Sequence, residues 1–167
     1  MYKFRHAKDV LIARRSGRDQ LTGLANRYQL RRDLNSAQVR KAKLIVYVLA
    51  DVDGLRRVMD NYGLAVGDRL LHEIAEQVFK GGYREGGDSF CAFATDMEVE
   101  VAKKWAESLR SRVEQLRLPG IPDLRVTARL GLVIATMPQD VDAIMRMGHD
   151  LVHCAPSDKH PNSVRLA

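Results

Sequence analysis

Two short stretches of this 167-residue chain carry side chains that could hold a metal ion and a phosphate group. Asp51-Val52-Asp53 follows an apolar run, and a spacing of two residues puts both carboxylates on one face of a strand. Carboxylate oxygens are the ligands that hard divalent cations prefer, together with substrate phosphates. The run Arg84-Glu85-Gly86-Gly87-Asp88-Ser89-Phe90 predicts a tight turn whose backbone could touch a ligand. Taken singly, the stretches are also compatible with an ordinary polar strand end and a plain hairpin.

A buried strand and a hairpin strand are the elements that would position these side chains. Residues 44–50 are almost continuously apolar and rich in β-branched side chains, which is typical of a central buried strand. Alternating side chains after the glycines predict a second strand that begins near Ser89. We therefore expect Asp51 to meet Gly86 and Gly87 at one edge of the sheet.

Helical periodicity predicts most of the remaining elements. Apolar residues recur three and four positions apart in segments expected to form helices at residues 26–36, 54–63, 67–80, 97–118 and 141–154. Residues 124–136 are expected to form one strand, or two strands with a bend at Gly131. These segments together predict a single α/β domain.

Composition and charge narrow the class of protein but do not select a partner. Two cysteines argue against a disulfide scaffold and favour a reducing cytoplasm. No apolar run reaches the length of a membrane span, and the first residues contain no signal-peptide segment. A net charge of +6 is compatible with nucleotides, nucleic acid or a membrane surface as partner.

Residues 1–18 are rich in lysine and arginine and carry apolar side chains at helical spacing, which predicts an amphipathic lead-in helix. This helix could bind an anionic partner, but we favour a solvated helix that was once joined to an upstream domain. On the last predicted helix, His149 and His153 have a spacing that can bind a metal ion. No third ligand is evident near them in the sequence, so two surface or half-buried histidines are the favoured interpretation.

Five segments in chain order resemble motifs of the GGDEF domain of diguanylate cyclases. The family motifs are D-x-L-T-G-L-x-N-R, D-[IV]-D, G-H-x-x-G-D, R-x-G-G-D-E-F and V-T-x-S-x-G. They are similar to residues 19–27, 51–53, 63–68, 84–90 and 126–131. The resemblance implies a GGDEF domain over residues 19–167, with a central mixed sheet flanked by helices, similar to the palm of nucleotide cyclases and polymerases. Active members join two GTP molecules into cyclic di-GMP, one bound to each of two facing domains.

The resemblance also implies roles for the residues that match. Asp51 and Asp53 correspond to the acids of the metal site, and Asp88 to the acid that activates the attacking 3′-hydroxyl. The positions that match nucleotide-binding residues are Gly86, Gly87, Asp68, and Arg56 in place of a lysine near the phosphates. Mg²⁺ is the implied cofactor if a nucleotide is bound, and no cofactor is implied otherwise.

Departures from the family pattern fall at separate contacts. Ser89 replaces the glutamate that ligates the metals, and a neutral hydroxyl is a weak ligand for Mg²⁺. Met59 replaces the asparagine that hydrogen-bonds guanine, and Leu64 replaces a histidine. Pro156 replaces the phosphate-binding lysine. The R-x-x-D product-inhibition motif is absent at residues 77–80.

Three classes of function remain, in order of preference. The first is a degenerate, catalytically inactive GGDEF domain that acts as a regulatory or protein-interaction module in bacterial cyclic di-GMP signalling. The second is an active diguanylate or other dinucleotide cyclase that uses GTP and Mg²⁺. The third is a basic nucleic-acid-binding module, which the low aromatic content of 6% disfavours. We expect weak binding of GTP or another nucleotide, a protein partner or a homodimer, and no nucleic acid.

Overall fold

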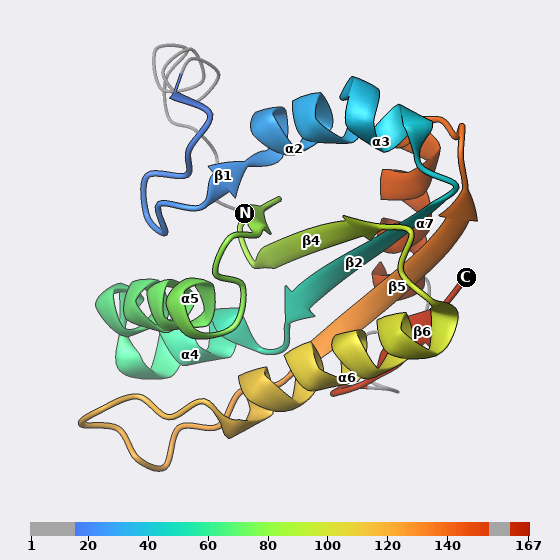
Figure 1. The fold of residues 1–167 in the computed structure, drawn as a ribbon. Helices are drawn as coiled ribbons and strands as arrows, with labels where there is room; N and C mark the ends of the chain where they lie inside the picture. The colour runs from blue at the N-terminus through green and yellow to red at the C-terminus, as the bar shows by residue number, and fades with distance from the viewer. Residues whose placement is uncertain (1–15, 154–160) are drawn as a thin grey trace.

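A six-stranded mixed β-sheet forms the centre of the structure, with strand order β1-β3-β4-β2-β5-β6 (Figure 1). The computed structural model describes residues 16–153 and 161–167. The predicted lead-in helix therefore lies almost entirely outside the described residues, as do Cys154 and Pro156.

The long strand β2 (Leu44–Val52) occupies the middle of the sheet. It pairs antiparallel with β4 (Ser89–Thr95) on one side and with β5 (Ala128–Thr136) on the other. Beyond β4 lie β3 (Tyr83–Arg84) and β1 (Ala25–Asn26), and beyond β5 lies β6 (Val164–Leu166). The outer pairs β1–β3 and β5–β6 are parallel, which confirms the predicted mixed sheet.

Side chains of β2 alternate between two apolar cores, one on each face of the sheet. Val46 and Val48 pack into the core that is shared with α4 (Leu55–Tyr62), α5 (Leu64–Gln77) and α6 (Val99–Gln115). Ile45 and Tyr47 pack into the core on the opposite face. A strand with a core on both faces must be apolar throughout, and this explains the unbroken apolar run in the sequence.

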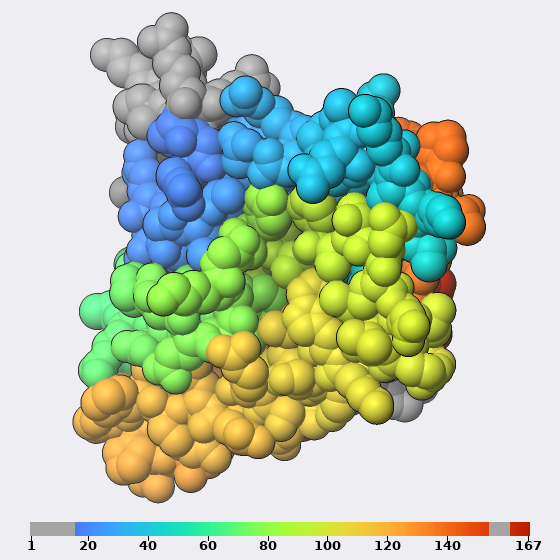
Figure 2. Space-filling model, in the orientation of Figure 1, coloured from blue at the N-terminus to red at the C-terminus, as the bar shows by residue number. Residues whose placement is uncertain are grey.

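Three helices cover that opposite face, namely α2 (Arg27–Leu34), α3 (Ala37–Lys41) and α7 (Val141–His153). Asn26 starts α2 because its side chain accepts hydrogen bonds from two backbone N–H groups of the first turn. In Figure 2, α2 and α3 (blue to cyan) run along the top of the molecule. None of the helices among the described residues combines the length and the apolar character that crossing a bilayer requires.

One predicted helix start is wrong, and a close contact at a glycine accompanies it. The helix expected to start at Gly67 begins three residues earlier, at Leu64. Gly67 lies inside α5, and a Cβ atom there would come 2.5 Å from Cγ of Met59 on α4, so the glycine permits the two helices to approach. Of the two alternatives left open at Gly131, the structure has the single strand: β5 continues through this residue, where a Cβ atom would lie 2.8 Å from the carbonyl oxygen of Gly148 on α7.

Other differences concern short elements. The helix expected at residues 26–36 is divided into α2 and α3, and Ser36 caps the second. The strand expected from residue 124 begins only at Ala128. The strands β1 and β6 were not predicted, because segments of two and three residues carry no periodic signal.

Candidate nucleotide and metal site

Strand register brings the predicted site residues to one end of the sheet. Asp51, near the end of β2, pairs with Ser89 on β4 and with Arg129 on β5. The backbone N–H of Val52 donates to the carbonyl oxygen of Asp88, 3.0 Å away, and so joins β2 to the glycine turn. The expected meeting of Asp51 with this turn at one edge of the sheet is therefore confirmed.

The strongest contacts of the two aspartates are with Arg129, which the sequence analysis did not single out. Nη2 of Arg129 lies 2.9 Å from Oδ2 of Asp51 and donates a hydrogen bond to it. Nε of Arg129 forms an ion pair with Oδ1 of Asp53 at 2.8 Å. The V-T-x-S-x-G motif has a serine at position 129, where this chain has arginine. Arg129 is therefore a further departure from the family pattern, and it is visible in the sequence.

Asp53 is also tied to two backbone segments. Its Oδ2 accepts hydrogen bonds from Oγ1 of Thr127, at 2.7 Å, and from the backbone N–H of Asn162, at 3.0 Å. Asn162 in turn donates from Nδ2 to Glu114 on α6 at 2.9 Å and accepts from Arg110. Asp53 thus anchors the segment that leads into β6.

Asp51 lies in an environment that disfavours its charge. Its side chain is only 6% exposed, and Asp88 lies close by. Burial, together with the negative charge of Asp88, raises the pKa of Asp51 to about 7, although Arg129 acts in the opposite direction. Oγ of Ser89 lies 3.4 Å from carboxylate oxygens of both Asp51 and Asp88. At the position where the motif has glutamate, Ser89 therefore presents a hydroxyl group to Asp51, while the carboxylate of Asp88 lies beside it.

In this arrangement the donor oxygens do not fit a divalent cation. Arg129 holds one oxygen of each aspartate, and the second oxygen of Asp53 already accepts two hydrogen bonds. Within residues 16–153 and 161–167, no three acidic, histidine or cysteine side chains converge as metal ligands do. The metal-binding role of Asp51 and Asp53 remains a prediction, and it requires these contacts to change.

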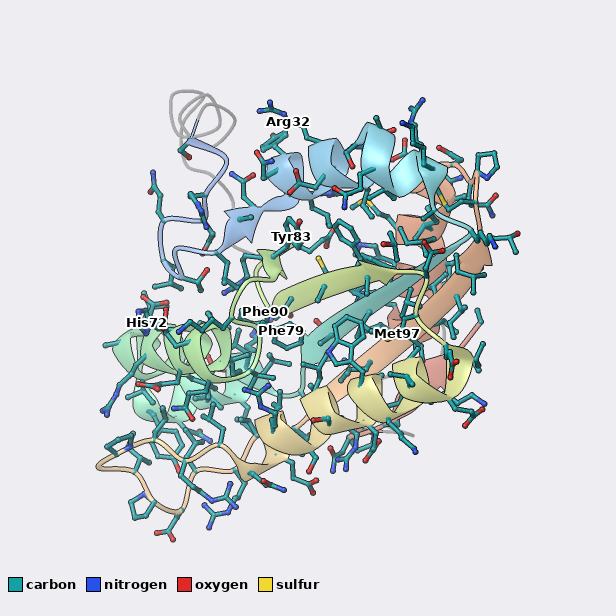
Figure 3. All side chains as sticks on the ribbon, viewed as in Figure 1. Arg32, His72, Phe79, Tyr83, Phe90 and Met97 are labelled. Atoms are coloured by element: carbon teal, nitrogen blue, oxygen red, sulfur yellow. The ribbon has the colours of Figure 1, made fainter. Side chains whose placement is uncertain are left out.

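The glycine turn is held from inside by Arg84. This buried side chain donates from Nε to the carbonyl oxygen of Gly86, at 2.6 Å, and from Nη2 to that of Gly87. Its guanidinium lies 4.6 Å from the ring centroid of Phe90, whose ring in turn stacks on Phe79 (Figure 3). The arginine of the motif therefore shapes the turn.

Glu85 provides a second contact between the turn and the helices. This buried carboxylate lies 3.1 Å from Nε of Arg27 on α2 and 3.2 Å from Nε2 of His149 on α7. The ring of His149 stacks on that of His153, and its side chain is 33% exposed. The prediction that both histidines are surface or half-buried residues is confirmed, since His149 is half-buried and His153 is exposed, but no motif in the sequence indicated the pairing of His149 with Glu85.

These contacts shift the pKa values of Glu85 and His149 so that both side chains are charged over a wider pH range. Burial by itself would raise the pKa of Glu85, but the hydrogen bond from His149 and the positive charges around the carboxylate bring it below its usual value. The hydrogen bond to Glu85 raises the pKa of His149 against the effect of burial. The pair is therefore most strongly charged at mildly acidic pH.

The predicted base and phosphate contacts lie on α4 and α5. Met59 packs against Gly67, so its thioether is committed to the contact between these two helices. Arg56 is 96% exposed and lies 4.0 Å from Asp60, and Leu64 is exposed at the start of α5. Asp68 lies partly exposed on α5. The nucleotide roles of Asp68, Arg56, Gly86 and Gly87 remain predictions.

The family model for the diguanylate cyclase GGDEF domain matches residues 16–155. Diguanylate cyclase VdcA of Vibrio cholerae is 29% identical over 125 residues, which are 69% of this chain and 37% of that protein. Diguanylate cyclase DgcN of Escherichia coli is 35% identical over 104 residues, 56% of this chain and 25% of that protein. The chain thus spans well under half the length of these relatives.

A solved structure of a diguanylate cyclase has a similar fold. The diguanylate cyclase SiaD of Pseudomonas aeruginosa, crystallised in complex with its activator SiaC, superposes with a TM-score of 0.82 at 26% identity. The match covers 96% of this chain and 66% of that chain. The predicted α/β fold, with its mixed sheet between helices, is confirmed by this likeness.

Proposed function

Since this chain belongs to the GGDEF domain family, we propose that it is a catalytically silent member that acts as a regulatory or protein-interaction module in cyclic di-GMP signalling. The relatives VdcA and DgcN are diguanylate cyclases by name, and the family relationship supports the signalling context. We place its action in the cytoplasm, where GTP and cyclic dinucleotides are made.

The observation that carries the proposal is the position of Ser89. Ser89 on β4 is paired with Asp51 on the neighbouring strand β2, and its Oγ lies 3.4 Å from Oδ1 of Asp51. The family motif has glutamate at this position. Phosphoryl transfer depends on negative ligands that fix the metal ions around the reacting oxygens. Loss of one well-placed electrostatic group commonly costs about 10²–10³ in rate. A hydroxyl group cannot supply that charge.

The position that would contact the guanine base also supports a catalytically silent domain. Met59 stands at the position of the guanine-binding asparagine and packs against Gly67 instead. A thioether is only a weak hydrogen-bond acceptor, so it does not select guanine. We therefore expect that GTP or another nucleotide binds weakly, and that Mg²⁺ enters only with the nucleotide.

A catalytically silent domain would act in signalling by binding a protein partner or a second copy of the chain. The diguanylate cyclase SiaD, crystallised in complex with its activator SiaC, is a precedent for a related protein that binds another protein. The second candidate function is an active diguanylate or other dinucleotide cyclase. It is favoured by the retained meeting of Asp51 with the glycine turn, through the hydrogen bond from Val52 to Asp88.

The test is product analysis after long incubation of concentrated protein with GTP or ATP and with Mg²⁺ or Mn²⁺. An active diguanylate cyclase run in parallel is the positive control. We expect no dinucleotide from the wild type, and no full activity from Ser89→Glu, because Met59 remains. Cyclic di-GMP formed by the wild type and abolished by Asp51→Ala would establish the cyclase instead.

A further inference from the structure

We infer that Arg129 is a built-in cation that takes the place of a divalent metal ion between Asp51 and Asp53. Its guanidinium reaches from β5 and contacts one oxygen of each carboxylate, at 2.9 Å and 2.8 Å. One positive group thus bridges both acids, as a bound ion would. The inference deepens the proposed function and rests on it, since it gives a reason why the retained aspartates do not assemble a metal site.

The position of Arg129 is set by the sheet. Asp51 and Arg129 are directly paired residues of two nine-residue strands, so their backbones cannot separate without breaking the β2–β5 ladder. All three side chains are largely buried, with exposed fractions of 14% for Arg129, 6% for Asp51 and 15% for Asp53. Salt and water therefore screen these ion pairs weakly.

The chemistry of the guanidinium opposes its exchange for a metal ion. Arginine stays protonated at every physiological pH and has no acceptor atom, so it cannot act as a metal ligand itself. A divalent ion beside it would be repelled and would have to displace it from both carboxylates. Among the described residues, Asp51 and Asp53 are the acids that pair with Arg129.

Asp53 adds a second obstacle to metal binding. Its Oδ2 already accepts from Thr127 and from the backbone of Asn162. Mg²⁺ requires nearly ideal octahedral geometry, and a carboxylate fixed from three sides cannot turn to supply it. In this chain the second acid of the motif therefore joins β2 to β5 and to the C-terminal segment.

The experiment is a Mn²⁺ titration of the full chain, with free Mn²⁺ measured by electron paramagnetic resonance. The informative variant is Arg129→Gln, which removes the charge and keeps polar atoms near both acids. The matched control is Arg125→Gln, which removes the same charge from an exposed side chain four residues earlier. Asp51→Asn in the Arg129→Gln chain tests whether any gained ion lies at the predicted place.

We expect the wild type and Arg125→Gln to show no Mn²⁺ binding that depends on Asp51. Arg129→Gln should bind Mn²⁺ at least about tenfold more tightly than the wild type, and Asp51→Asn should abolish the gain. Arg129→Lys is the second variant, because it keeps a positive charge beside the acids if Arg129→Gln does not fold. It should exclude Mn²⁺ as the wild type does.

Binding of Mn²⁺ by the wild type that is lost in Asp51→Asn would overturn the inference, and so would the absence of any gain in a folded Arg129→Gln. Tight, Asp51-dependent binding by Arg129→Lys would also overturn it. The titration does not read product formation. A wild type that makes cyclic di-GMP but excludes Mn²⁺ would therefore refute only the silent-domain proposal, whereas one that binds Mn²⁺ at Asp51 without product would refute only this inference.

Discussion

Nε2 of His149 lies 3.2 Å from Oε2 of the buried Glu85, so an ion pair joins the last long helix to the residue before the two glycines. Arg27 contacts the other oxygen of the same carboxylate at 3.1 Å. Glu85 therefore fastens the glycine turn to α2 and α7 together. One of the contacts that hold this turn is therefore strongest when His149, which lies far from the turn in the sequence, is protonated.

Thermal stability should therefore depend on pH through His149. Its pKa is raised in the folded chain, so its contribution is complete below the ordinary value of 6.5 and is lost as pH rises through the folded pKa. The pKa of Glu85 is lowered, so its contribution is complete above the ordinary 4.5 and is lost at lower pH. We expect the pair to stabilise the chain fully between these two values.

The measurement is the melting temperature across pH 4 to 9 for the wild type and for His149→Gln. The variant should melt below the wild type near pH 6, and the gap should narrow at alkaline pH. The exposed His72 provides the matched control, His72→Gln. A gap that stays constant over the whole range would contradict the charged pair.

For Asp51, in contrast to the Glu85–His149 pair, burial favours the uncharged form of the side chain. The pKa of Asp51 is raised to about 7, so the folded chain favours the neutral carboxyl group. The contribution of this neutral group to the free energy of unfolding is fully present below the ordinary pKa of 3.8 and is lost as pH rises through 7. Asp51→Asn keeps the shape and removes the charge. Its melting temperature, relative to the wild type, should therefore increase from pH 5 to pH 8. A relative decrease over this range would show that the pair with Arg129 outweighs burial and the repulsion from Asp88.

Replacement of Arg84 should loosen the glycine turn. Its guanidinium donates to the carbonyl oxygens of Gly86 and Gly87. A hydrogen bond from a charged group contributes about 1.5–3 kcal/mol, so Arg84→Ala should lower the free energy of unfolding by about 3 kcal/mol. Arg84→Lys, with a single point of contact, should also destabilise the chain. Urea unfolding measures the loss, and Arg32→Ala, at an exposed position of α2, is the control (Figure 3). Equal effects of Arg84→Ala and Arg32→Ala would show that Arg84 does not hold the turn.

The approach of α7 to the sheet requires a glycine at position 148. A Cβ atom there would come 2.7 Å from Cε1 of the buried Tyr47. Alanine improves helix propensity by about 1 kcal/mol, but overpacking costs about 1–3 kcal/mol. We expect Gly148→Ala to destabilise the chain by about 1 kcal/mol in urea unfolding. Glu76→Ala, at an exposed helical position, should change stability by less than about 0.5 kcal/mol, and a more stable Gly148→Ala would contradict the contact.

Local patterns in the sequence predicted the framework well. The apolar run at residues 44–50 identified the central strand, because a strand with a core on both faces tolerates few polar residues. The two glycines before Asp88 identified the turn that meets this strand. Element boundaries were less accurate, since the starts of α5 and β5 depend on packing between elements.

By itself, the sequence determined the fold, the family and the identity of the residues at the end of β2 and in the glycine turn. Only the tertiary structure decided how their charges are balanced. Arg129 lies 78 positions from Asp51, and it meets that acid because β5 pairs with β2 in one particular register. Glu85 meets His149 because α7 packs across the same face of the sheet. Electrostatic energy depends on distance and burial, and the fold sets both for residues that are far apart in the chain.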